Sequence, residues 1–194
     1  IDFGNAVHFD NVSGYFIDFE IQSLAYRAPE VVFGCEFDEK IDVWSIGCIL
    51  AEMFLRKPFL MGSDWKNQLY LIVELLGKQN DNDLSFIENV KAKDFLLSLE
   101  TYSEENIESI FKDVEMSLES KDLITKMLIF NPHKRISVND ALAHPFLSEL
   151  YCPEDEPTTT PLNPLEFEFE NLSLNKEQIK DLIYEEVLLY HYPE

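Results

Sequence analysis

The sequence has few basic residues. It contains 15 Lys and Arg against 37 Asp and Glu, which gives a formal net charge of −22 over 194 residues. A chain this acidic has no general attraction for nucleic acid or for an anionic membrane surface, which argues against both as partners. Proteins with basic docking segments are the partners that this charge favours.

Cysteine and long apolar runs are also scarce. The three cysteines, Cys35, Cys48 and Cys152, are odd in number and far apart, which argues against a disulfide framework or a zinc site. No apolar run reaches the ~18 residues of a membrane span, and the start has no signal-peptide character. We therefore expect a protein of a reducing, intracellular setting with no membrane association.

The hydrophobic content of 46 % suffices for one sizeable core and for part of a larger domain. The chain begins at Ile1 within what reads as a strand-to-loop junction, so we interpret it as a fragment. Residues 2–24 are mixed polar and aromatic without a sustained period, which is typical of a long functional or mobile loop.

Helical patterns dominate the rest of the chain, and no segment convincingly predicts a strand. Residues 41–56 are apolar on nearly every side, which predicts a helix buried at the centre of a domain. Ser63 is expected to cap the next helix and Gly77 to end it. Further helices are predicted at 117–129 and 137–143. The predicted fold class is therefore mainly α.

The last part of the chain differs in composition. Residues 152–174 hold four of the nine prolines and alternating Phe and Glu, which predicts an extended segment on a surface. Asn175 then caps a helix with one apolar face, and such a face needs a partner. We expect residues 150–194 to dock onto a main body formed by residues 1–149.

Three short motifs follow one another at informative distances. Asp-Phe-Gly occupies residues 2–4, Ala28-Pro29-Glu30 begins 26 residues after Asp2, and Asp-Val-Trp-Ser begins at Asp42. Their order and spacing resemble the activation segment and central helix of eukaryotic protein kinases. Longer stretches, among them YRAPEVVFG, KMLIFNPHKRISVNDALAHPFL and CPEDEP, resemble the mitogen-activated protein (MAP) kinases. The first half also resembles cyclin-dependent kinases, but the tail of this chain fits them poorly.

This resemblance implies the C-terminal lobe of the protein-kinase fold, with the MAP-kinase insertion and C-terminal extension. Residues 1–149 would be part of the kinase domain, with the activation segment at 2–30, and residues 150–194 would be the extension. The N-terminal lobe and the catalytic loop would lie upstream.

The resemblance also assigns roles to single residues. Asp2 would bind Mg²⁺ against the phosphates of ATP, the two implied cofactors, although an ordinary loop Asp is the alternative. Phe3 would pack between the lobes, and Gly4 would let the chain turn. Glu30 and Arg135 would form a buried ion pair, and removing one partner should then cost ~3–5 kcal/mol.

Two acids stand where MAP kinases carry a phosphorylated Thr and Tyr. These are Asp18 and Glu20, and neither can accept a phosphate, so we hypothesise that fixed carboxylates replace the usual switch. Arg27 matches an Arg that receives one phosphate, while Leu24 replaces a second such Arg. The alternative is that both acids are solvated and that the segment needs no ordering.

Three further positions concern the substrate site. Ser23 stands where the family has Thr, and its hydroxyl could bridge catalytic residues upstream. Ala25 replaces an aromatic residue beside the pocket for the residue after the phosphoacceptor, which puts the implied Ser/Thr-Pro preference in doubt. Asp42 resembles the acid that braces the catalytic loop, or it is simply an acid in the first turn of a helix.

Two partner surfaces carry over by resemblance. Glu154, Asp155 and Glu156 resemble an acidic patch that binds basic docking motifs, although Cys152 replaces an acid expected there. A second set resembles a hydrophobic pocket for Phe-containing substrate motifs: Val32, Phe33, Trp65, Leu69 and Phe95. The alternative for both sets is that these side chains are ordinary surface residues or fill the core.

We therefore predict part of a cytoplasmic or nuclear MAP-kinase-like Ser/Thr kinase that phosphorylates proteins in intracellular signalling. The 194 residues alone should be inactive, because they contain no Gly-rich phosphate loop, no identifiable phosphate-binding Lys and no His-Arg-Asp loop. One alternative is a pseudokinase or scaffold that binds docking peptides without catalysis. Another is a lobe that acts as a decoy for docking partners. The sequence predicts no oligomeric state.

Overall fold

The computed structural model describes residues 6, 21–77, 79–99, 107–161, 163, 165, 169 and 172–191. The chain divides into two compact units, Ile1–Pro153 and Glu154–Glu194. The boundary between them lies a few residues after the predicted one. Docking of the tail onto the main body stays a prediction.

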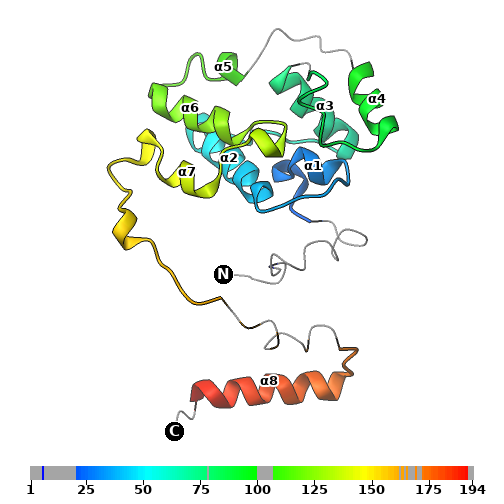
Figure 1. The fold of residues 1–194 in the computed structure, drawn as a ribbon, viewed down its shortest axis with the longest axis vertical. Helices are drawn as coiled ribbons and strands as arrows, with labels where there is room; N and C mark the ends of the chain where they lie inside the picture. The colour runs from blue at the N-terminus through cyan, green and yellow to red at the C-terminus, as the bar shows by residue number, and fades with distance from the viewer. Residues whose placement is uncertain are drawn as a thin grey trace. The chain divides into compact units, whose positions relative to one another are not determined.

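The first unit is helical, and its described residues contain no strand (Figure 1). The predicted mainly α class is therefore confirmed. Its α-helices are α1 (Pro29–Val32), α2 (Lys40–Leu55), α3 (Trp65–Leu76), α4 (Val90–Ser98), α5 (Ile107–Ile110), α6 (Leu118–Met127) and α7 (Val138–Leu142). Single 3₁₀ turns are η2 (Leu24–Tyr26), η3 (Pro132–Lys134) and η4 (Pro145–Leu147).

Helix α2 lies at the centre of this unit and packs along α6. Trp44, Cys48 and Ala51 are fully buried on it. Gly47 permits the close approach of the two helices, because a Cβ atom there would lie 2.8 Å from Met127 Cβ and 3.0 Å from Leu128 Cδ2. The separation of α2 and α6 therefore depends on the missing side chain.

The prediction that this helix is buried on nearly every side is wrong for one face. Ile46, Ile49 and Met53 are 50 %, 46 % and 64 % exposed. They recur at intervals of three and four residues, so they form one stripe along the helix. The described helices pack against the other faces of α2 and leave this apolar stripe open.

The predicted N-cap of α3 is wrong by one residue. Asp64 caps the helix, and its Oδ1 accepts hydrogen bonds from the N–H groups of Lys66 and Asn67 at 2.9 Å each. These hydrogen bonds lower the pKa of Asp64 below its ordinary value, and the bond from Asn67 has the largest effect. Asp and Ser are both good caps, so the pattern alone could not choose between Ser63 and Asp64. Gly77 ends the helix with φ 76°, as predicted.

The helices predicted at 117–129 and 137–143 are found as α6 and α7. The hydroxyls of Ser117 and Ser137 accept hydrogen bonds at the starts of α6 and α7. Helix α4 was not predicted from its pattern, since Leu96 is its one buried residue and its apolar period is weak. Its N-cap could have revealed it, because Asn89 Oδ1 accepts hydrogen bonds from the N–H groups of Lys91 and Ala92.

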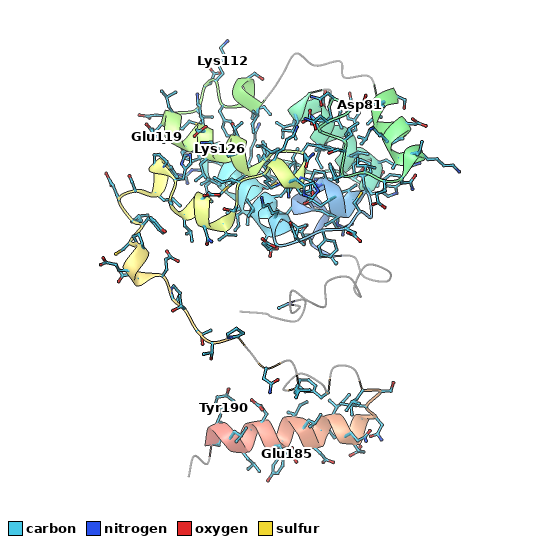
Figure 2. The ribbon with its side chains drawn as sticks, in the orientation of Figure 1. Asp81, Lys112, Glu119, Lys126, Glu185 and Tyr190 are labelled. Atoms are coloured by element: carbon cyan, nitrogen blue, oxygen red, sulfur yellow. The ribbon has the colours of Figure 1, made fainter. Side chains whose placement is uncertain are left out.

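The second unit begins within the turn η5 (Pro153–Asp155), and its one described α-helix is α8 (Lys176–His191). Asn175 caps α8 as predicted, accepting hydrogen bonds from the N–H groups of Glu177 and Gln178. Figure 2 shows side chains projecting all around this helix, among them Glu185 and Tyr190, and none of its residues is buried. None of the helices that the structure describes has the length and apolar character needed to cross a bilayer.

Candidate functional site

The structure contains the predicted ion pair between α1 and the residue after η3. Arg135 Nη1 lies 2.6 Å from Glu30 Oε1, and Arg135 Nη2 lies 2.9 Å from Glu30 Oε2. Both side chains are fully buried. This two-point geometry matches the planar guanidinium to the carboxylate and compensates both charges inside the core.

Arg135 also donates to three backbone carbonyls in two other segments. It donates to the carbonyls of Ile129 at 3.0 Å, Lys40 at 2.7 Å and Phe130 at 3.4 Å. Its guanidinium lies over the ring of Trp44, 5.2 Å from the centroid, within the range of a cation–π contact. One side chain thus joins α1, the start of α2 and the end of α6. The sequence predicted the ion pair but not these partners.

The loop from residue 21 to 28 precedes α1 and has an unusual backbone. Gln22 has φ 62°, in the left-handed region that a residue with a side chain rarely adopts. Its carbonyl accepts hydrogen bonds from Arg27 Nη2 at 2.8 Å and Nε at 3.3 Å. Sequence reasoning did not single out Gln22, since Gly or Asn is the usual signal for this conformation.

The same loop is fastened to α2 at Tyr26. The Tyr26 hydroxyl donates to Glu52 Oε2 at 3.1 Å, and Glu52 Oε1 accepts from the N–H of Phe59. The hydrogen bond with Glu52, together with desolvation, raises the pKa of Tyr26. Glu52 was not predicted as a site residue, because nothing in the pattern of α2 separates it from a surface acid.

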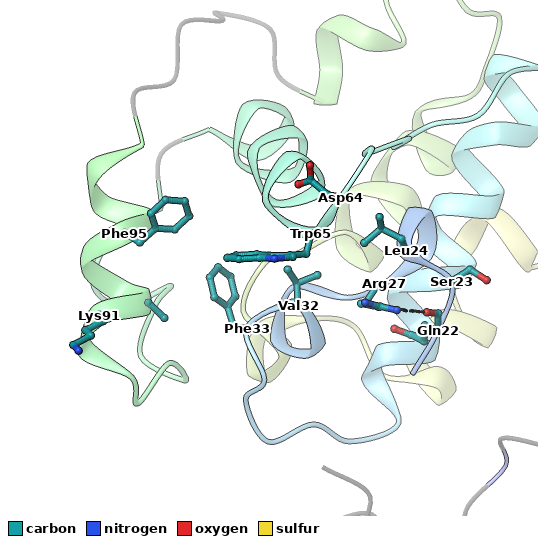
Figure 3. Close-up of a pocket in the computed structure, with 11 residues that line it drawn as sticks. Gln22, Ser23, Leu24, Arg27, Val32, Phe33, Asp64, Trp65, Lys91 and Phe95 are labelled. Atoms are coloured by element: carbon teal, nitrogen blue, oxygen red, sulfur yellow. Dashed lines mark hydrogen bonds between the residues drawn. The ribbon is translucent and has the colours of Figure 1, made fainter. Parts of the chain in front are cut away.

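The loop opens onto a pocket of about 1280 Å³ (Figure 3). Four of the five residues predicted for a hydrophobic docking pocket line it: Val32, Phe33, Trp65 and Phe95. The wall on the loop side is formed by Gln22, Ser23, Leu24 and Arg27. Four predicted docking residues and three predicted activation-segment residues, Ser23, Leu24 and Arg27, therefore share one cavity.

Leu69 is the exception, and its assignment to the pocket wall is wrong. It is fully buried in the hydrophobic core and does not line the cavity. Helix α1 packs against α3, and Leu69, one turn into α3, belongs to the core that this packing closes. Trp65, at the first position of the helix, is 51 % exposed and remains accessible.

The remaining predicted residues are placed as follows. Asp42 lies in the first turn of α2, where desolvation raises the pKa of its carboxyl, and it accepts no hydrogen bond from the described residues. Glu154, Asp155 and Glu156 are exposed at and after η5, and Cys152 is exposed just before it. Five predicted residues lie outside the described residues: Asp2, Phe3, Gly4, Asp18 and Glu20.

Comparison with known proteins gives a consistent result. The model of the family described as protein kinase domain matches residues 1–147. Mitogen-activated protein kinase 11 of Arabidopsis thaliana is 41 % identical over 167 residues, which cover 86 % of this chain and 44 % of that protein. Mitogen-activated protein kinase mpkB of Aspergillus fumigatus is 40 % identical over 194 residues, covering 96 % and 54 %. The chain thus spans about half the length of these relatives.

Proposed function

Because this chain belongs to the protein kinase domain family, on its MAP kinase branch, we propose that the full-length protein phosphorylates Ser or Thr residues of other proteins. The family match over residues 1–147 carries this proposal. The γ-phosphate of ATP would be transferred to a substrate hydroxyl in a cytoplasmic or nuclear signalling pathway.

Asp2 is the proposed ligand of Mg²⁺. A carboxylate is the kind of oxygen ligand that Mg²⁺ prefers, and the bound ion would offset charge on the ATP phosphates. Among the described residues, no group of three or more His, Cys, Asp or Glu side chains could hold a metal ion. The proposal for the metal therefore rests on Asp2.

The backbone of the loop supports a preference for Pro after the phosphoacceptor. Gln22 lines the pocket, and its carbonyl already accepts two hydrogen bonds from Arg27. A substrate residue bound there cannot readily use this carbonyl to satisfy its N–H, and a buried N–H without an acceptor is unfavourable. Proline has no N–H, so it avoids this cost.

Asp18 and Glu20 are proposed as fixed substitutes for the phosphorylated residues of the family. A carboxylate carries one negative charge against ~1.5–2 for a phosphate, so the ordering they provide should be weaker. Arg27 supports this assignment, because its guanidinium lies in the loop directly after these acids.

The substitution Glu20→Ala in the full-length protein is expected to lower phosphate transfer to a Ser-Pro peptide several-fold. Glu20→Gln, which removes the charge and keeps the shape, should act in the same direction. Glu36→Ala, which removes an exposed acid after α1, is the matched control and should have no effect. Unchanged activity of both Glu20 variants would reject the substitution of carboxylates for phosphates.

The kinase assay itself tests the main proposal. Full-length protein is incubated with ATP, Mg²⁺ and a Ser-Pro peptide, and transfer of phosphate is measured with Asp2→Ala as the control. Binding of a basic docking peptide without any transfer would instead favour a pseudokinase or scaffold. The exposed acids Glu154, Asp155 and Glu156 and the absence of phosphosites at 18 and 20 are compatible with that second function.

A further inference from the structure

The segment after η5 contains a hydroxyl group with a proline directly behind it. Of the nine prolines in the sequence, only Pro161 follows a Ser or Thr, and that residue is Thr160. Thr158 and Thr159 stand just before it and are each followed by another Thr. Thr160-Pro161 is therefore the one pair in this sequence that has the form of the substrates proposed for the kinase.

Thr160 is accessible and is not held in a regular element. Residues 156–161 are exposed and belong to no helix or strand. Among the described residues, neither the backbone nor the hydroxyl of Thr160 has a hydrogen-bond partner. Pro157 and Pro161 restrict φ, and a residue before proline favours an extended conformation. Thr160 can therefore enter a substrate cleft without the unfolding of any described element.

An acidic segment at η5, residues 154–156, precedes Thr160 closely. Its three acids are exposed, and Glu156 is four residues before Thr160. At ~3.3–3.6 Å per residue, the two residues are at most about 14 Å apart. A phosphate on Thr160 would add ~1.5–2 negative charges to the three already present. Phosphorylation would thus extend the acidic segment and raise its charge.

The sequence after Thr160 complements the pocket at the loop. Residues 166–170 read Glu-Phe-Glu-Phe-Glu. The pocket is lined by three aromatic side chains and two cations: Phe33, Trp65, Phe95, Arg27 and Lys91 (Figure 3). Asp64 also lines it, but its carboxylate is engaged in capping α3. Because aromatic rings pack together and carboxylates pair with cations, the tail of a second copy offers this pocket a suitable ligand.

We infer that Thr160 is a phosphorylation site, that the full-length protein phosphorylates it on a second copy, and that its phosphate extends the acidic segment. Thr160 Oγ1 forms a bond to the γ-phosphorus of ATP while the bond from that phosphorus to the β,γ-bridging oxygen breaks. ADP leaves with the electron pair of the broken bond, and the hydroxyl proton is released. This inference rests on the proposed kinase function and goes further by naming a substrate.

The test uses two forms of the full-length protein. The wild type is the enzyme, and an affinity-tagged Asp2→Ala variant, which lacks the proposed Mg²⁺ ligand, is the acceptor. After incubation with ATP and Mg²⁺, the tagged acceptor is recovered and its phosphorylated residues are identified by mass spectrometry. We expect phosphate on Thr160 of the acceptor, where it can come only from another molecule.

Three further substitutions in the acceptor test the assignment to this residue. Thr160→Ala should remove the phosphate from the segment, and Pro161→Ala should slow its addition by about tenfold or more. Thr159→Ala is the matched control, since it removes a neighbouring exposed hydroxyl, and the rate should stay within about twofold. Phosphate on Thr158 or Thr159 in place of Thr160, or equal rates for Pro161→Ala and Thr159→Ala, would overturn the inference.

A Ser-Pro peptide in a parallel reaction separates this inference from the proposed function. Transfer to the peptide but not to Thr160 would overturn the inference and leave the kinase function standing. Transfer to neither acceptor would reject both.

Binding of a basic docking peptide tests the role of the added charge. The phosphorylated protein should bind this peptide about twofold more tightly or better than Thr160→Ala protein treated in the same way, and added salt should reduce the difference. Equal affinities would overturn the claim that the phosphate extends the acidic segment.

Discussion

Arg135 is completely buried and binds both carboxylate oxygens of Glu30, so removing either side chain leaves a charge inside the protein without its counter-ion. We expect Arg135→Ala to lower the free energy of unfolding by about 3–5 kcal/mol. Urea denaturation of the full-length protein, followed by circular dichroism, measures this change.

The neighbouring Lys134 is the matched control. Its Nζ lies 2.7 Å from Asp83 Oδ1, but the two side chains are 41 % and 24 % exposed. A pair in contact with water contributes at most about 1 kcal/mol, so Lys134→Ala should have a small effect. If Lys134→Ala and Arg135→Ala lowered the free energy of unfolding equally, the prediction that the buried ion pair contributes more than the exposed one would be wrong.

One buried thiol, Cys48, and one partly buried thiol, Cys35, predict a loss of stability at alkaline pH. Burial raises the pKa of Cys48 to about 12 and that of Cys35 to about 11, from about 9 in the unfolded chain. A raised pKa means that the folded state favours the protonated thiol, so this contribution is complete below pH 9 and is lost as the pH rises toward the folded values.

The denaturation midpoint should therefore fall between pH 9 and 11, and Cys48→Ala should reduce the slope of that fall. The slope is compared rather than the absolute stability, because the substitution also leaves a cavity. Cys152→Ala removes an exposed thiol and should keep the wild-type slope. A slope unaffected by Cys48→Ala would contradict the prediction.

The candidate site could be predicted from sequence where a residue type identifies its own chemistry. Glu30 and Arg135 carry opposite charges in recognisable motifs, and the structure places them together. The hydrogen bonds from Arg27 to the carbonyl of Gln22 could not be predicted, since a backbone carbonyl gives no signal of its partners. They depend on a backbone conformation and on distances between elements that only the folded chain defines.

At the scale of elements, the packing of α2 on α6 depends on Gly47. Gly47→Ala would place a methyl group against Met127 and Leu128, and we expect it to cost about 1–3 kcal/mol of folding free energy. On an open helix the same substitution would be stabilising by ~1 kcal/mol. Urea denaturation measures the change in the free energy of unfolding. A loss of stability is expected if α2 packs closely on α6 at Gly47, and a gain is expected if it does not.

Ile49→Ala provides a control on the same helix, because Ile49 belongs to the exposed stripe. Its effect should be within about 0.5 kcal/mol, as for most surface substitutions. A stabilising Gly47→Ala variant would show that α2 and α6 can separate without cost.

Most helices were predictable because their apolar residues and their caps agree. Ser117, Ser137 and Asn175 each stand before an apolar period, and each caps its helix. Helix α4 lacks such a period, and the open stripe on α2 could not be foreseen. The composition of a helix says which residues are apolar but not which neighbours cover them.

At the scale of the whole molecule, the net charge of −22 predicts how partners bind. We expect the double substitution Glu154→Lys with Asp155→Lys to weaken binding of a basic docking peptide to the full-length protein. Raising the salt concentration should weaken the wild-type complex too, because the Debye length is only about 8 Å at physiological ionic strength. Fluorescence anisotropy of a labelled peptide measures both effects.

Asp181→Lys tests whether the position matters as well as the total charge. It reverses a single charge on α8, outside the acidic segment at η5. If the docking site is specific, Asp181→Lys should reduce the affinity for the peptide much less than the single substitution Glu154→Lys does. Equal losses would mean that the peptide responds to the overall field of the protein.

The ion pair between Glu30 and Arg135 also has a kinetic consequence. Its partners are 105 residues apart, and Arg135 binds carbonyls at Lys40 and Ile129 as well. Contacts between distant residues carry the entropy of closing a long loop, so this network should form after α2 and α6 have met. Arg135→Ala would then leave the folding rate nearly unchanged and accelerate unfolding. The buried pair would thus determine mainly how long the native state lasts.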